Sequence, residues 1–289
     1  MARGVHPPRR AVVEAVGRAL DEDLTPLGDL TSALLPDGLE AEAAFVAREG
    51  GVVAGCDCAT EAFGQVDPDL GVAWLVDDGD VVAPGATLAT VRGPLAPILT
   101  AERTALNFLG HLSGIATRTR AFVDAAGPAG PARIWDTRKT TPGLRSLEKA
   151  AVRAGGGANH RGSLSDWVLL KDNHVALFGI ADAVSRARAM WPARTVHVEC
   201  DRLDQVHEAL AAGADALLLD NMTPDQVRAC VAVAAEAAGA GRRPLLEVSG
   251  GITLDTVAAY AATGVDCISV GSLTNAAPVL DIGLDLDPA

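Results

Sequence analysis

The basic residues of this chain are divided unevenly between arginine and lysine. Only three of the 24 basic residues are lysines, and Lys139, Lys149 and Lys171 all lie within one 33-residue segment. A lysine ammonium is a compact, mobile charge that suits phosphate, whereas the planar guanidinium of arginine suits carboxylates. Residues 133–174 include eight basic and four acidic side chains, in a chain whose net charge is −13. This segment predicts a binding site for a small, multiply charged anion. Lys139 and Lys171 follow predicted strands, whereas Lys149 is expected to be a surface charge on a helix.

Charged, amide or small residues follow six short apolar runs, each typical of a buried strand. The runs lie at 132–135, 167–170, 196–198, 216–219, 245–248 and 267–270. In parallel α/β barrels the active site forms at the carboxyl ends of several strands, so we expect the residues after these runs to converge. They are Thr137, Arg138, Lys139, Lys171, Glu199, Asp220, Asn221, Ser249, Gly250, Gly251, Gly271 and Ser272, with His160 and Arg161 as further donors.

Glu199 and Asp220 place two carboxylates beside the predicted anion site. They could bind sugar hydroxyls or a divalent cation, or stabilise positive charge that develops on a sugar ring. The alternatives are a general acid and base pair, or a structural role such as an ion pair with Lys171.

Two loops of small residues, Ser249 to Gly251 and Gly271 to Ser272, follow the last two runs. Exposed backbone N–H groups at the start of a helix bind anions, and glycine permits a close approach. Phosphate sites in α/β barrels usually follow the last strands, so these loops are predicted to bind phosphate.

The elements that must position these residues alternate between strand and helix. An internal repeat at an offset of 51 residues matches Gly213 with Gly264 and Asp215 with Asp266, each after a helical pattern and before an apolar run. A repeated helix, glycine cap and buried strand is the unit of a parallel α/β barrel or of a doubly wound sheet. We favour the barrel, because a doubly wound sheet would concentrate its polar residues at one crevice.

The first part of the chain has a different pattern. Short strand-like runs between glycine and proline turn signals predict a small sheet-containing domain. A helical pattern follows, in which Gly110 and Gly114 either let another element approach closely or break the helix in two. The strand-like runs lie at 43–48, 51–54, 72–76 and 81–91, and the helical pattern at 101–125.

Composition limits the functional classes. The sequence has no run of 18 apolar residues and no signal-peptide pattern, so we expect a soluble, cytoplasmic protein. Its pI of about 4.8, without a basic tail or stripe, argues against binding to nucleic acid or to anionic membranes. Five cysteines, an odd number, are expected to be buried, reduced thiols.

Several long motifs resemble those of the quinolinate phosphoribosyltransferase family, and the likeness covers nearly the whole chain. The central ones are DTRKTTPGLR at 136–145, GGGANHR at 155–161 and KDNH at 171–174. The others are EDL at 22–24, GDLTS at 28–32, ERTALN at 102–107, HVE at 197–199, LDNM at 219–222, EVSGGI at 247–252 and LDIGL at 280–284.

The resemblance implies an α/β fold with two domains. An N-terminal α/β sandwich at 1–115, completed by 276–289, would stand beside an incomplete, seven-stranded α/β barrel at 116–275. It also implies a homodimer, or a dimer-based hexamer, in which the N-terminal domain of one subunit closes the barrel of the other. Arg103, which by itself would be an exposed helix charge, would then reach into the neighbouring active site.

The same resemblance implies the substrates. Quinolinate would bind to Arg103, Thr137, Arg138, His160, Arg161 and Lys171, and phosphoribosyl pyrophosphate to Lys139, Lys171, Glu199, Asp220, Asn221, Ser249, Gly250, Gly251, Gly271 and Ser272. Lys139, Lys171, Glu199 and Asp220 would be catalytic. Mg²⁺ would be the cofactor, carried mostly by the substrate beside Glu199 and Asp220. The reaction would yield nicotinate mononucleotide, pyrophosphate and CO₂ for NAD biosynthesis.

The chain departs from the family pattern at Ala150, Val248 and Asn275, where Tyr, Ala and His are common. A paralogue with another aromatic carboxylate as acceptor is therefore one rival. A Schiff-base aldolase with Lys171 as its nucleophile is a second, and a non-catalytic nucleotide-binding regulator is a third.

Overall fold

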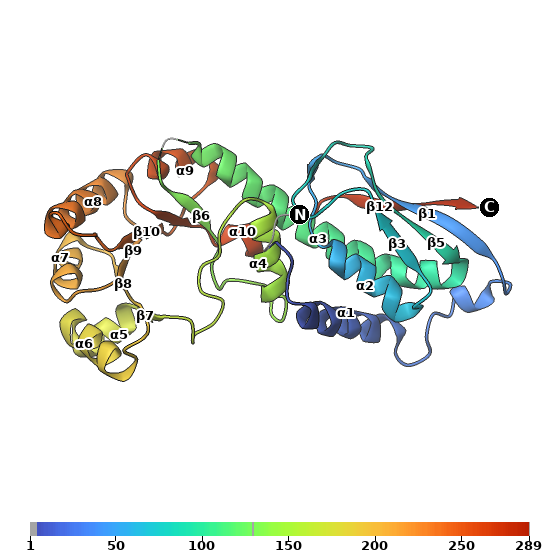
Figure 1. Cartoon of the computed structure of the whole chain (residues 1–289), viewed down its shortest axis with the longest axis horizontal. Coiled ribbons are helices and arrows are strands. Elements are labelled where there is room, and N and C mark those ends of the chain that lie inside the picture. The colour runs from blue at the N-terminus through green and yellow to red at the C-terminus, as the bar shows by residue number, and fades with distance from the viewer. Residues whose placement is uncertain (1–4, 129, 289) are drawn as a thin grey trace. The chain divides into compact units, whose positions relative to one another are not determined.

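The computed structural model describes residues 5–128 and 130–288, which form two compact units. The first unit comprises Met1–Arg120, Lys139–Gly156 and Ser272–Ala289, and the second comprises Ala121–Arg138 and Gly157–Gly271. Each unit contains its own main sheet, and the long helix α3 (Leu95–Ala126) runs from the first into the second (Figure 1).

The first unit is built on a four-stranded antiparallel sheet in the order β12-β1-β5-β3. Residues of β1 alternate between buried and less buried positions, as expected of a strand with one face on a core. Phe45 of β1 packs against Phe63 of α2 with ring centroids 5.9 Å apart and stacks on Trp74 of β3 at 5.8 Å. The elements are α1 (Arg9–Leu24), a 3₁₀ turn (Ser32–Leu34), β1 (Glu40–Ala47), β2 (Gly51–Val52), α2 (Cys56–Val66), β3 (Gly71–Trp74), β4 (Val81–Val82), β5 (Thr87–Pro94), α4 (Arg145–Ala154), α10 (Ser272–Asn275) and β12 (Ile282–Pro288).

The glycines of α3 serve close approach, because the helix is continuous through both of them. A Cβ on Gly114 would lie 1.9 Å from the carbonyl oxygen of Pro278, and one on Gly110 would lie 3.0 Å from that of Leu280. The Leu280 N–H also donates to the Gly110 carbonyl at 3.0 Å. The tail before β12 thus packs directly on the helix backbone, which only glycine permits.

The second unit contains a parallel sheet in the order β6-β11-β10-β9-β8-β7. Strands β7 to β11 are neighbours in both sequence and space, with helices along the outside of a curved sheet (Figure 1). No reversal of strand order occurs among them, which confirms the barrel-type arrangement over the doubly wound one. The elements are β6 (Arg133–Trp135), β7 (Val168–Leu170), α5 (Asp172–Phe178), α6 (Ile180–Met190), β8 (Val196–Cys200), α7 (Leu203–Ala211), β9 (Ala216–Asp220), α8 (Pro224–Ala238), β10 (Leu245–Ser249), α9 (Leu254–Ala261) and β11 (Cys267–Ser269).

Six strands of this sheet are regular, whereas the resemblance implied seven. A seventh position, beyond β6, is occupied by a one-residue parallel bridge between Trp135 and Ala158. The Ala158 N–H donates to the Ile134 carbonyl at 2.8 Å, and the Asp136 N–H donates to the Ala158 carbonyl at 3.1 Å. The glycines before Ala158 explain why the pairing is short, since glycine weakens strands.

The internal repeat corresponds to a repeated clamp at the amino ends of the strands. Asp215 precedes β9 and accepts from the Val196 N–H at the start of β8, at 2.7 Å. Asp266 precedes β11 and accepts from the Leu246 N–H of β10 at 2.8 Å, and also binds Arg243. Each repeated aspartate therefore joins its own strand to the preceding one.

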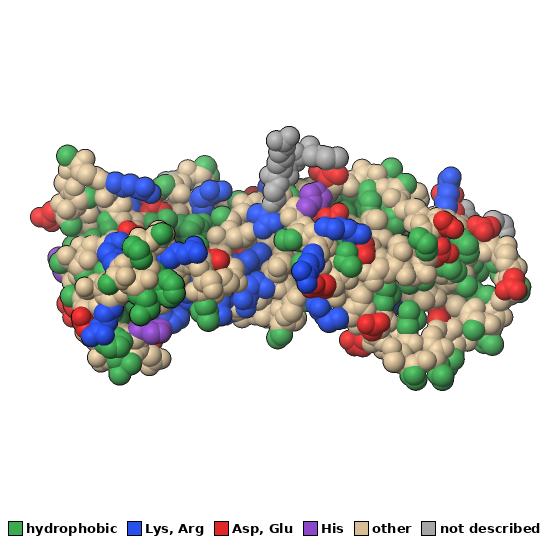
Figure 2. All heavy atoms as spheres, turned by 60° about the horizontal axis from the view of Figure 1, so that its bottom comes forward, with side chains coloured by type: hydrophobic (Ala, Val, Ile, Leu, Met, Phe, Trp, Pro, Cys, Tyr) green, Lys and Arg blue, Asp and Glu red, His purple; other side chains and the backbone are tan. Residues whose placement is uncertain are grey.

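All five cysteines are free and buried, as expected. Among the described residues, no helix has both the length and the apolar character needed to cross a membrane. On the face shown in Figure 2, basic side chains form separate groups among acidic and uncharged ones, without one continuous basic stripe.

Candidate active site

The predicted site residues that follow β7, β8, β9 and β10 share one face of the parallel sheet. In the strand register Glu199 aligns with Leu218, two residues before Asp220, and Asp220 aligns with Ser249. Side chains alternate between faces along a strand, so Glu199, Asp220 and Ser249 point to the same side. Lys171, which follows β7, joins them through contact with Glu199. The sequence prediction of convergence is confirmed for these four residues.

Lys171 and Glu199 form an ion pair, with Nζ 3.2 Å from Oε2. The lysine side chain is half exposed and the glutamate is mostly buried. The Lys171 backbone N–H lies at the start of α5 and donates to His174 Nδ1 at 3.2 Å. Lys171 is therefore held by its backbone and by Glu199 while its ammonium stays open to a ligand. The contact does not support the aldolase rival, which needs a desolvated, neutral amine.

The loops after β9 and β10 interlock through their backbones. Asn221 has a positive φ of 55°, and its N–H donates to the Ser249 carbonyl at 2.9 Å. Its side-chain amide donates to Asp220 Oδ2 at 2.7 Å, which orients that carboxylate. Gly250, with φ at 96°, lies so close that a Cβ there would be 2.2 Å from Asn221 Oδ1. Glycine at position 250 is therefore a geometric requirement of this loop pair.

The cationic part of the site follows β6. Asp136 is fully buried and accepts from the His160 N–H at 2.8 Å and from the Asn159 amide at 2.7 Å. This carboxylate ties the segment that carries His160 and Arg161 to the end of β6. Burial lowers the pKa of Arg161, and the nearby charge of Arg138 lowers it further. Two guanidinium groups this close repel each other, so a dianionic ligand would relieve the repulsion.

Two tryptophan rings and two imidazoles, including that of His160, contact one another in a row. His160 lies edge-on to Trp135 at 5.8 Å and to Trp167 at 5.0 Å, and Trp167 stacks on His197 at 5.0 Å. Burial lowers the pKa of His197 to about 4, so this imidazole is neutral at pH 7. Trp167 also offers its carbonyl to Arg161 Nη1 at 3.3 Å. The rings give His160 and Arg161 a rigid, largely apolar support.

Three predicted site residues belong to the first unit. The Lys139 side chain is exposed, and its carbonyl accepts from the Thr274 hydroxyl at 2.8 Å. The Ser272 hydroxyl accepts from Arg118 at 3.1 Å. Arg103 is exposed on α3, and no ion pair joins it to any described residue. The remaining predicted residues, Thr137 and Gly271, are partly buried within the second unit.

One interpretation of the sequence is wrong. Lys149 was expected to be a surface charge on its helix, but it is only 6% exposed. Seven of the ten residues of α4 are buried, including Glu148, whose Oε1 lies 2.9 Å from His111 Nε2 of α3 and whose Oε2 accepts from the Thr141 N–H at 3.2 Å. The exposed residue of this short helix is Ser146, so Lys149 lies on an enclosed side.

Sequence reasoning also missed residues that support the site. Asp136, Trp167, His197 and Glu247 are not assigned a role by the sequence patterns, although one of them has a recognisable signal. Glu247 is a lone acidic residue inside an apolar run, and a charge is rarely buried without a partner. The structure places it at 1% exposure on the sheet face that carries Glu199.

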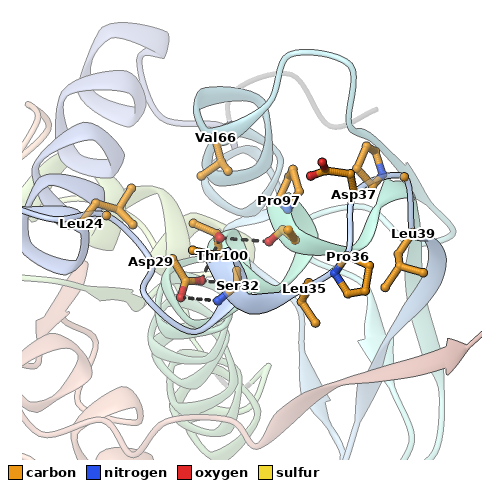
Figure 3. Close-up of a pocket in the computed structure, with 15 residues that line it drawn as sticks. Leu24, Asp29, Ser32, Leu35, Pro36, Asp37, Leu39, Val66, Pro97 and Thr100 are labelled. Atoms are coloured by element: carbon orange, nitrogen blue, oxygen red, sulfur yellow. Dashed lines mark hydrogen bonds between the residues drawn. The ribbon is translucent and has the colours of Figure 1, made fainter.

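A cavity of about 570 Å³ lies in the first unit, and none of the predicted site residues lines it. Its walls are mainly apolar, from residues such as Leu35, Leu39 and Val66, and its charged residues are Asp29 and Asp37 (Figure 3). The Ser32 hydroxyl and N–H and the Thr100 hydroxyl donate to Asp29 and hold its pKa at about 2. With acidic and apolar walls, this cavity does not suit an anion.

Comparison with known proteins agrees with the geometry. The model of the quinolinate phosphoribosyl transferase N-terminal domain matches residues 29–113, and that of the C-terminal domain matches residues 115–285. The carboxylating nicotinate-nucleotide pyrophosphorylase of Mycobacterium leprae is 46% identical over 96% of this chain and 97% of its own length.

Solved structures of similar proteins have the same fold. The nicotinate-nucleotide pyrophosphorylase of Francisella tularensis has a TM-score of 0.92 and 38% identity, with 98% of each chain covered. NadC from Streptococcus pyogenes has a TM-score of 0.91 and 37% identity, covering 98% of this chain and 99% of its own. The chain belongs to the quinolinate phosphoribosyltransferase family.

Proposed function

We propose that this protein transfers the phosphoribosyl group of phosphoribosyl pyrophosphate to quinolinate, with decarboxylation, in NAD biosynthesis. The observation that carries the proposal is the shared sheet face of Lys171, Glu199, Asp220 and Ser249, beside the crowded guanidinium groups of Arg138 and Arg161. The cations suit a planar dicarboxylate, and the carboxylates and glycine loops suit a phosphorylated sugar.

The quinolinate subsite is assigned to the cationic part of the site. Arg138 and Arg161 would each bind a carboxylate through a guanidinium fork, with His160 as a further donor. The half-exposed ammonium of Lys171 is paired with Glu199 and open to a ligand, and we assign it contacts with both substrates. Thr137 and the Arg103 side chain of a partner subunit would complete the subsite.

The phosphoribosyl pyrophosphate subsite is assigned to the remaining strand ends. The loops at Ser249, Gly250 and Gly251 and at Gly271 and Ser272 would bind phosphate through backbone N–H groups. Glu199, Asp220 and Asn221 would bind the ribose, and Lys139 the pyrophosphate. Asp220 is already oriented by Asn221, which reduces the cost of reorganisation when the substrate binds.

The chemistry follows from these charges. Departure of pyrophosphate leaves positive character on the ribose ring, which the carboxylates of Glu199 and Asp220 stabilise. The pyridine nitrogen of quinolinate then bonds to C1 of the ribose. The nitrogen becomes cationic, so the C–C bond to the adjacent carboxylate can break, because its electron pair remains on a ring carbon next to that cation. CO₂ leaves, and a proton from solvent replaces it.

Mg²⁺ would bind at this site together with the phosphates of the substrate. Within the described part of the chain, no cluster of three or more His, Cys, Asp or Glu side chains is arranged to hold a metal ion. Mg²⁺ commonly uses one or two carboxylates together with substrate phosphates, and Glu199 and Asp220 can supply these. When bound, it would neutralise charge on the leaving pyrophosphate.

The assay that tests the proposal measures CO₂ and pyrophosphate released from quinolinate by the purified protein. We expect both products in equal amounts, only when phosphoribosyl pyrophosphate and Mg²⁺ are present. Turnover of nicotinate in place of quinolinate would favour the paralogue. Borohydride trapping of a substrate on Lys171 would favour the aldolase, and substrate binding without any turnover would favour the regulator.

We further propose a cytoplasmic homodimer, or a dimer-based hexamer, with shared active sites. The exposed position of Arg103 on α3 supports a role outside its own subunit. Arg103→Ala and Arg138→Ala should each be nearly inactive alone. After subunit exchange the mixture should recover up to about a quarter of wild-type activity, because random pairing makes half of the dimers mixed and each has one intact site. A mixture of dimers that have demonstrably exchanged but remain inactive would contradict shared sites.

A further inference from the structure

Glu148 is a fully buried acid of the first unit. It lies in the first turn of α4, and its side chain is 0% exposed. A carboxylate loses its hydration on burial, which is costly unless hydrogen bonds replace the water. Glu148 takes no part in the proposed chemistry, so the two hydrogen bonds that it makes indicate what it does.

The two oxygens of Glu148 bond different elements. Oε1 lies 2.9 Å from Nε2 of His111 on α3, and Oε2 accepts from the Thr141 N–H at 3.2 Å. Both separations are within the range of protein hydrogen bonds. The side chain thus reaches back over the start of its own helix and ties the loop before α4 to α3.

The loop before α4 begins at Lys139. The Lys139 carbonyl accepts from the hydroxyl of Thr274, a buried residue of α10, at 2.8 Å. Two residues further on, the Thr141 N–H donates to Glu148. Side chains from α10 and α4 therefore fix the backbone on either side of Thr140, whereas the Lys139 side chain is exposed.

We propose that Glu148 is a positioning residue that acts through Lys139. By holding Thr141, it keeps the loop in the conformation that directs the Lys139 ammonium to the pyrophosphate of the phosphoribosyl donor. This inference rests on the proposed function, which assigns Lys139 to the pyrophosphate. A lysine side chain is long and flexible, and a fixed backbone lowers the entropy that is lost when its ammonium binds a ligand.

The simplest alternative is that Glu148 only joins α4 to α3 and so stabilises the first unit. Its loss would then lower the free energy of unfolding without a selective effect on either substrate. A positioning role predicts instead a change in the loop that carries Lys139 and in the affinity for one substrate. Loop exchange and the two KM values therefore separate the two roles.

The first test measures whether the loop depends on an acceptor at position 148. Glu148→Met removes both acceptor oxygens, whereas Glu148→Gln keeps one oxygen for the Thr141 N–H and offers an amide to His111 Nε2. Amide hydrogen exchange in residues 139–144 of the full-length protein, followed by mass spectrometry, should become about tenfold faster in Glu148→Met, the loss of one hydrogen bond. In Glu148→Gln it should stay within about threefold of wild type.

The second test measures the consequence for the substrates. Glu148→Met should raise the KM for phosphoribosyl pyrophosphate about tenfold and leave the KM for quinolinate within about twofold of wild type, whereas Glu148→Gln should keep both within about threefold. Titration calorimetry of phosphoribosyl pyrophosphate with Mg²⁺ completes a double-mutant cycle. In Lys139→Ala protein, Glu148→Met should no longer change the affinity.

Glu61 provides a matched control. It is also a buried acid of the first unit, and its polar partners are Arg9 and Gln65. Glu61→Met should lower stability without changing either KM or the exchange of residues 139–144. If Glu148→Met does not fold, His111→Leu carries the test, because it releases only Oε1. We expect it to raise the loop exchange and the KM for phosphoribosyl pyrophosphate about threefold.

Four results would overturn the inference: unchanged loop exchange in Glu148→Met, equal effects of methionine and glutamine, an equal rise in both KM values, or an undiminished effect in Lys139→Ala. If wild-type protein turns over quinolinate while Glu148→Met matches it, only the role of Glu148 fails. If wild-type protein turns over no quinolinate, the proposed function fails, and the role of Glu148 in substrate binding fails with it, whatever the exchange of the loop.

Discussion

The two ends of the parallel sheet use the same residue types in opposite ways. At the amino end, Asp215 and Asp266 each accept a backbone N–H from a neighbouring strand and pair with Arg188 and Arg243, so charges there are balanced within the protein. At the carboxyl end, Arg138 and Arg161 repel each other. The amino end therefore contributes stability, whereas at the carboxyl end an anionic ligand would reduce the repulsion between the two guanidinium groups.

The strongest test of this contrast is removal of Lys171. Lys171→Ala should lower kcat/KM by about a thousandfold, because it deletes the cation that we propose to contact both substrates. Stability should change by no more than about 1 kcal/mol, since the lost ion pair is half exposed. Steady-state kinetics and urea unfolding measure the two quantities.

Arg186→Ala is a matched control, because Arg186 pairs with Asp182 on the exposed face of α6. It should leave both quantities unchanged. A large loss of stability in Lys171→Ala would show that the carboxyl end is also built for stability, and would break the contrast.

His197 tests the apolar support behind the site. Its folded-state pKa of about 4 lies below the usual value near 6.5, so acid favours the unfolded chain, which binds the proton more readily. The neutral ring contributes stability fully above about pH 6.5, and this contribution declines as the pH falls toward 4. The loss amounts to at most roughly 3 kcal/mol.

His197→Phe keeps an aromatic ring against Trp167 but cannot titrate. We expect unfolding free energies at pH 7.5 and pH 4.5 to differ less in this variant than in wild type. His207→Gln, at an exposed position, should keep the wild-type dependence on pH. An unchanged pH dependence in His197→Phe would mean that His197 is not the group whose protonation opposes folding.

The amino-end clamp should give the smallest effect, confined to stability. Asp266→Ala leaves the Leu246 N–H without its acceptor and Arg243 without its carboxylate partner, which should cost about 2 kcal/mol and lower the Tm by roughly 5 °C. Asp215→Ala should cost less, because its pair with Arg188 is more exposed. Kinetic constants below the Tm should match wild type in both.

A fall in kcat of either clamp variant at temperatures where it is fully folded would contradict the separation of the two ends. Equal losses of stability in the two variants would indicate that the hydrogen bond from the backbone N–H contributes more to stability than the ion pair with arginine.

Much of the carboxyl end could be predicted from the sequence. Lys171, Glu199, Asp220 and Ser249 follow apolar runs, and parallel strands bring their carboxyl ends together whatever the connecting helices are. Glu247 could not be assigned in the same way. Its contacts with Ser269 and His160 depend on the side-chain register of two strands and on a residue that is distant in the sequence.

The error at Lys149 has a related cause. Sequence periodicity reveals which face of a helix is apolar, but it does not reveal how many other elements enclose that helix. The sequence also did not decide whether Gly110 and Gly114 allow close packing or break their helix. The segment that packs on them, at Pro278 and Leu280, lies far along the chain. Long-range neighbours thus account for what the sequence alone left undecided.

The last strand of the first unit also bears on how the protein is made. β12 pairs with β1 along seven residue positions, yet it follows the whole parallel sheet in the chain. A ribosome therefore synthesises β1 long before its partner, and one edge of β1 stays open until the catalytic strands have emerged. An open strand edge invites pairing with other nascent chains. Until β12 has been synthesised, this edge of β1 lacks the strand that covers it in the folded protein.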